Sequence, residues 1–75
     1  MSAEILANSD ETRSNLRESV SMGAYTLDQV KELATRAVLL AGEAFKGDDL
    51  KEAESELRFA ADLLAYVLQY SVKVN

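Results

Sequence analysis

Cysteine and histidine are both absent from this 75-residue chain. Without cysteine there is no disulfide bond, and without either residue there is no zinc site of the usual kind. A domain of this size buries only about 60% of the surface that its unfolded chain exposes, so its core is marginal. Small domains that lack a disulfide or a metal commonly gain stability from a partner subunit. The composition therefore favours association, and we expect no cofactor and no metal.

The same absences weaken the case for an enzyme. Histidine is the most common general base, and cysteine is a strong nucleophile. None of the three glycines belongs to a glycine-rich phosphate-binding loop. Serine and threonine hydroxyls without a base are ordinary helix caps and surface groups. We therefore expect a non-enzymatic protein with no catalytic residues.

Basic charge and long apolar runs are also scarce. Eight Lys and Arg residues stand against thirteen Asp and Glu residues, which gives a net charge of −5. Binding to phosphates or to an anionic membrane needs clustered basic residues. No apolar run approaches the roughly 18–20 residues that span a bilayer, and the first residues carry Glu4 rather than the basic region of a secretory signal. We expect no nucleic acid, no membrane and a cytoplasmic location.

Proline is missing as well, and the apolar fraction of 48% is that of a globular protein. The absence of proline and the low count of three glycines favour long, uninterrupted helices. Residues 27–46 show apolar side chains at helical spacing. Thr26 and Gln29 fit a capping box at the start of this helix, and Gly47 suits the C′ position at its end.

A second long helix is predicted over residues 50–72. Asp49 is suited to cap it, and Glu52 would close a second capping box. So short a connection forces the two helices into an antiparallel hairpin. The carboxylates near this point, including Glu56, could bind a hard cation, but they lack the spacing of an EF-hand loop. We interpret them as caps and as charges that suit a helix N-terminus.

The N-terminal third is less well specified. Leu16 and Val20 lie four residues apart on one narrow apolar face, and Gly23 is suited to end a helix. This pattern predicts a short, weak helix over residues 11–21. The predicted organisation is a flexible arm (residues 1–9) followed by one small helical domain (residues 10–75).

The helix over residues 50–72 has two apolar faces rather than one. The first has the steps of three and four residues typical of a coiled-coil seam, and it consists of Leu50, Ala53, Leu57, Ala60, Leu64 and Val67. The second lies roughly 130° round the helix. We call it the aromatic stripe, and it consists of Phe59, Leu63, Tyr66 and Tyr70.

One neighbouring helix cannot cover both of these faces. Leu16 and Val20 are too few to cover the aromatic stripe, which would leave a large apolar patch in water. Tyrosine and phenylalanine are enriched at protein interfaces. We therefore predict that Phe59, Leu63, Tyr66 and Tyr70 bind a protein partner. The alternative is that they form the core against the N-terminal helix.

Part of the chain resembles one helix pair of the tetratricopeptide family. The matching residues are Gly42-x-x-Phe45-x-Gly47-Asp48, followed by Ala53-x-x-x-Leu57-x-x-Ala60. In that family a glycine and an aromatic residue end the first helix, and a small residue, a large residue and an alanine space the second. The turn here is one residue short, and the array of about three repeats that such folds need is missing. The resemblance implies a helical protein-binding surface.

These observations predict an all-α fold, in which an antiparallel helical hairpin and a short N-terminal helix assemble as a homodimer into a four-helix-type bundle. The predicted function is that of a small acidic regulator or inhibitor, which binds a larger protein through the apolar and aromatic face of its last helix. Two alternatives stay open: a ligand- or metal-binding helical bundle, and a co-chaperone-like subunit of a hetero-complex.

Overall fold

Across residues 8–74 the fold consists of three α-helices. The computed structural model describes residues 8–74, with side chains for residues 8–70. Within this range the elements are α1 (Asp10–Ser21), α2 (Leu27–Lys46) and α3 (Leu50–Val74), with no strand. The all-α prediction is confirmed, and none of these described helices has both the length and the apolar character needed to cross a bilayer. Most of the predicted arm falls on residues 1–7, outside the described range.

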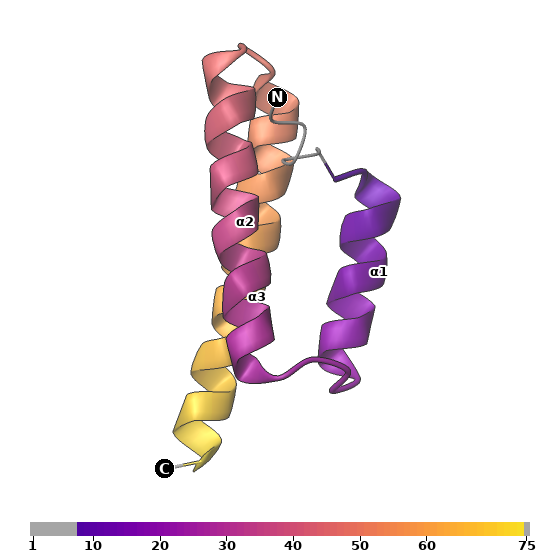
Figure 1. Ribbon diagram of the computed structural model, residues 1–75, viewed down its shortest axis with the longest axis vertical. Helices are drawn as coiled ribbons and strands as arrows, with labels where there is room; N and C mark the ends of the chain where they lie inside the picture. The colour runs from indigo at the N-terminus through magenta and orange to yellow at the C-terminus, as the bar shows by residue number, and fades with distance from the viewer. Residues whose placement is uncertain (1–7, 75) are drawn as a thin grey trace.

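The main contact of the fold joins α2 and α3, which lie side by side (Figure 1) and share far more contacts than α1 shares with either. Ala37 and Ala41 of α2 and Ala53 and Ala60 of α3 are all buried. Small side chains let two helix backbones approach closely, since interaxial distance depends on the side chains at the contact. The buried contact therefore includes these four alanines, and larger side chains such as Val30 and Leu40 are buried as well.

The start of α1 is fixed by Ser9, and its end by Gly23. The Ser9 hydroxyl accepts a hydrogen bond from the N–H of Thr12 at 3.0 Å, so Ser9 caps the helix without a reciprocal bond. Gly23 has a φ of 80°, a left-handed conformation that glycine adopts without strain. The N–H of Gly23 donates to the carbonyl of Val20, as the sequence leads one to expect of a C′ residue.

The two long helices begin differently. At α2 the predicted capping box is present: Gln29 N–H donates to the Thr26 hydroxyl at 3.1 Å, and Thr26 N–H donates to the Gln29 side chain at 2.9 Å. At α3 the Asp49 carboxylate accepts from Glu52 N–H at 3.3 Å. The Glu52 carboxylate, however, accepts from Arg13. The predicted second capping box therefore lacks the bond from the Asp49 N–H to the Glu52 side chain, and this part of the prediction is wrong.

The turn between α2 and α3 also differs from the prediction at one residue. Gly47 has a φ of −87° and forms the cap itself, whereas Asp48 carries the positive φ of 63°. The N–H groups of Asp48 and Asp49 donate to the carbonyls of Phe45 and Ala44 at 3.1 and 2.8 Å. This is the bond pattern of a Schellman motif, with aspartate rather than glycine in the left-handed position.

Candidate functional site

A buried ion pair joins α1 to α3. Arg13 is 2% exposed and Glu56 is fully buried. The Arg13 Nη1 donates to Glu56 Oε2 at 2.8 Å, to Glu52 Oε2 at 3.0 Å and to the carbonyl of Asn8 at 3.0 Å, while its Nη2 donates to Asp10 Oδ1 at 2.6 Å. Such burial is tolerable only when the charges are paired and hydrogen-bonded. The cluster therefore clamps the first helix onto the third.

The guanidinium of Arg13 stays charged over the whole accessible pH range. Burial on its own lowers the pKa of Arg13, but the hydrogen bonds to Glu52 and Asp10 and the charge of Glu56 outweigh it, so that the pKa lies above its ordinary value. The carboxylates of Glu52 and Glu56, near the start of α3, thus already accept hydrogen bonds from Arg13. Among residues 8–70, no group of three or more acidic side chains is placed to hold a metal ion. We interpret the cluster as structural.

The aromatic stripe is divided between the core and the surface. Phe59 and Leu63 are only 1% and 2% exposed and belong to the hydrophobic core. Tyr66 is half-buried against that core, and Tyr70 is 41% exposed. The structure therefore brings only two of the four predicted partner-binding residues to the surface.

The Arg17 side chain adds to the cover that α1 gives the aromatic stripe. The Arg17 guanidinium lies over the Phe59 ring at 5.3 Å from its centroid, and Arg17 Nε donates to Asp62 Oδ2 at 2.8 Å. Arginine can shield apolar surface with its stem while its charge is paired elsewhere. The sequence prediction that the apolar residues of α1 are too few to cover all four stripe residues left out this contribution. Phe59 and Leu63 are buried, whereas the two tyrosines of the stripe keep exposed surface.

The spacing of residues along α1 already indicates that this helix can cover part of α3. Arg13, Leu16, Arg17 and Val20 follow steps of three, one and three residues, and so they share one helix face. Counting only Leu and Val on that face makes it too narrow. Counting the two arginines as amphipathic side chains widens that face.

Tyr66 and Tyr70 form a pair on the last turns of α3 that have described side chains. Their ring centroids are 4.8 Å apart and the ring planes are tilted by 41°. A hydrogen bond with Tyr70 is the main cause that raises the pKa of the Tyr66 hydroxyl, with loss of hydration second. Their role as partner-binding residues remains a prediction.

A second apolar surface lies on the other side of α3. It consists of large side chains that are 51–67% exposed, from α2 and from α3, and we call it the leucine face: Val38, Phe45, Leu50, Leu57, Leu64 and Leu68. Leu57 and Phe59 are two residues apart, so their side chains leave the helix about 160° from each other. The surplus apolar surface that the sequence predicts on α3 is thus present, but it is on the opposite side from the clamp.

The leucine face is continuous across the two helices. A shallow hollow of about 470 Å³ is lined by Phe45 of α2 and by Leu50, Ala53, Glu54, Leu57 and Arg58 of α3. Val38 lies seven residues before Phe45, and Leu64 seven after Leu57, so each extends the face along its own helix. The seam predicted from the sequence is therefore split. Its alanines Ala53 and Ala60 are buried, whereas Leu50, Leu57 and Leu64 are exposed.

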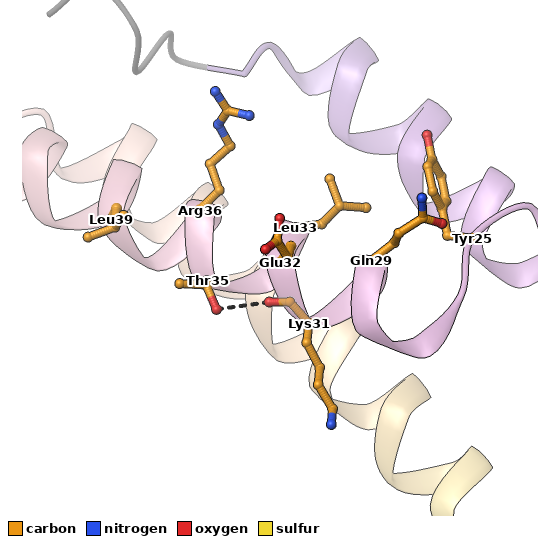
Figure 2. A pocket seen from close by; sticks show the side chains of 8 residues that line it. All are labelled: Tyr25, Gln29, Lys31, Glu32, Leu33, Thr35, Arg36 and Leu39. Atoms are coloured by element: carbon orange, nitrogen blue, oxygen red, sulfur yellow. Dashed lines mark hydrogen bonds between the residues drawn. The ribbon is translucent and has the colours of Figure 1, made fainter.

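A groove along α2, beside the segment that connects it to α1, is another concave surface (Figure 2). Its volume is about 520 Å³, and it is lined by Tyr25, Gln29, Lys31, Glu32, Leu33, Thr35, Arg36 and Leu39. Six of these eight residues carry a polar group, and Thr35 is already used locally, since its hydroxyl donates to the carbonyl of Lys31 at 2.9 Å. Leu39 is 54% exposed and lies in this groove, away from the leucine face.

No protein-family model, curated protein or solved structure matches this chain. The resemblance to one tetratricopeptide helix pair is thus not accompanied by a family match. The case for a function therefore depends on the surfaces described above.

Proposed function

We propose that the protein is a small, non-enzymatic protein-interaction module that binds a helical partner through the leucine face and regulates or inhibits that partner by covering it. The supporting observation is that six large apolar side chains of α2 and α3 are exposed, and that Phe45, Leu50 and Leu57 among them line one hollow. Contiguous apolar patches of this size on small proteins commonly mark interaction sites. The last helix thus remains the binding element, as the sequence suggests, but through its other side.

The remaining chemistry of the chain supports binding rather than catalysis. Histidine and cysteine are absent, and Glu52 and Glu56 are engaged by Arg13. We do not favour a metal-binding bundle, because these carboxylates would have to leave a buried arginine unpaired. The homodimeric four-helix bundle predicted from the sequence is one assembly that the leucine face could form.

The test compares two surface leucines with a third on a different face. A tagged protein carrying Leu57→Glu and Leu64→Glu is expressed in its native cell next to the wild type and Leu39→Glu, and bound proteins are cross-linked and identified. All three side chains are similarly exposed, so each variant should keep its helical circular dichroism. We expect the double variant to lose its partner and Leu39→Glu to keep it. Equal capture by all three would overturn the proposal.

A further inference from the structure

We infer that the occupant of the leucine face is a second copy of this chain, which packs its own leucine face there so that two α2–α3 pairs form a four-helix bundle. This inference rests on the proposed function, because it names the partner of the same surface. Three properties of the face support it: the spacing of its residues, its area and the charges at its edge.

The spacing of the face suits another helix. Leu57, Ala61, Leu64 and Leu68 follow steps of four, three and four residues, and all four are exposed. Seven residues separate Leu57 from Leu64 and Ala61 from Leu68, and this heptad spacing keeps a stripe aligned with a partner helix along its length. A β-strand or an irregular loop has no matching period. The surface that covers α3 is therefore itself helical.

The width and area of the face fit a two-helix partner. Phe45 and Val38 extend it onto α2, so a single helix laid along α3 would leave them in water. Six large apolar side chains that are about half exposed present roughly 600 Å² per copy, so two copies would bury about 1,200 Å², the lower end of standard protein–protein interfaces. A second copy offers a face of the same width and the same area, which makes the contact self-complementary.

The charges at the edge of the face favour an apolar partner over a highly charged one. The two charged residues that line the hollow, Glu54 and Arg58, are paired with each other at 2.8 Å within one chain. Covering them leaves no unpaired charge behind. The acidic clamp residues Glu52 and Glu56 belong to the side of α3 that α1 covers. The net charge of −5 therefore does not prevent two copies from meeting at their leucine faces.

The experiment is sedimentation equilibrium of the purified wild-type chain across the micromolar range, with the Leu57→Glu/Leu64→Glu variant and Leu39→Glu as the matched control. We expect a dimer mass for the wild type and Leu39→Glu, and a monomer mass for the double variant with unchanged helicity. A monomeric wild type, or dissociation caused equally by Leu39→Glu, overturns the inference.

Thiol labelling gives a second readout, which can still be interpreted when a variant is only partly folded. Because the chain has no cysteine, Leu64→Cys and Leu39→Cys each introduce a single reactive thiol. The labelling rate of Leu64→Cys should fall several-fold as protein concentration rises, while that of Leu39→Cys should stay constant. Protection of Leu64→Cys that does not depend on concentration would point to cover by residues 1–7 of the same chain and would overturn the inference.

Failure of this inference and failure of the proposed function are distinguishable. If the wild type is a monomer while the double variant still loses a cross-linked partner in cells, the second copy is excluded and the binding face stands. If the wild type is a monomer and cellular capture does not depend on Leu57 and Leu64, both fail.

Discussion

Arg13 of α1 and Glu56 of α3 form an ion pair of 2.8 Å in which both side chains are almost completely removed from water. The carboxylate of Glu56 also accepts from the backbone N–H of Asn8 at 3.3 Å and from its side-chain amide at 3.4 Å. Removing one partner of such a pair leaves a buried charge unpaired. This costs much more folding stability than replacing both charges together. This asymmetry provides a direct test of the clamp.

Arg13→Met should destabilise the fold by about 3–5 kcal/mol, because it leaves the buried carboxylate of Glu56 without its counter-charge. The double variant Arg13→Met/Glu56→Leu should regain most of that loss, since no buried charge remains. The free energy of unfolding in urea measures both effects. A cost below about 1 kcal/mol for Arg13→Met would show that water reaches Glu56 and that the clamp is weak.

Phe59→Ala should cost about 3–5 kcal/mol, as expected for removing a buried ring from a well-packed core. Tyr70→Ala should cost about 1 kcal/mol or less, because Tyr70 is exposed and contributes mainly its contact with Tyr66. Thermal or urea unfolding of the two variants separates the buried part of the aromatic stripe from its surface part. Similar costs at the two positions would contradict the division described above.

The turn residues give a matched pair of backbone substitutions. Asp48 and Gly23 both have a positive φ at the end of a helix, but only glycine adopts it without strain. Asp48→Gly should therefore stabilise the protein by about 0.5–1 kcal/mol. Gly23→Ala should destabilise it by about 1 kcal/mol. No atom lies within 4 Å of a Cβ placed at Gly23, so the second effect would come from the backbone alone. A stabilising Gly23→Ala would refute the assignment.

The tyrosine pair predicts a dependence on alkaline pH. A hydrogen bond with Tyr70 raises the pKa of Tyr66 in the folded chain. The folded state therefore holds its proton more tightly than the unfolded state does. The stabilisation is fully present below the ordinary tyrosine pKa and is lost as the pH rises through the folded pKa. Tyrosinate absorbance should show late ionisation of Tyr66, and Tyr70→Phe should bring it back towards the ordinary value. An unchanged titration in Tyr70→Phe would exclude this cause.

Local signals in the sequence predicted the helices well. The α2 bounds coincide with the prediction, and the Thr26–Gln29 box is present, because capping depends on residues three positions apart. The start of α1 lies one residue before the predicted start, and α3 runs to Val74 rather than to residue 72. Such differences at helix ends depend on fraying and on individual hydrogen bonds.

The surfaces were harder to predict, because they depend on contacts distant in the chain. Glu52 was expected to close a capping box, but Arg13, 39 residues away, competes for its carboxylate. Leu57 and Ala60 belong to one seam in the sequence, yet they leave the helix about 60° apart, and only Ala60 lies on the buried side. Which part of an apolar face is covered thus depends on where the neighbouring helix lies, which the periodicity of one helix does not contain.

The two sides of α3 should respond to added salt in opposite ways. The exposed pair Arg17–Asp62, which helps to hold α1 over Phe59, weakens when mobile ions screen it. Sulfate at the same time strengthens the burial of apolar side chains such as Leu57 and Leu64. Adding sulfate would therefore weaken the Arg17–Asp62 pair while strengthening any contact that the molecule makes through its outer leucines.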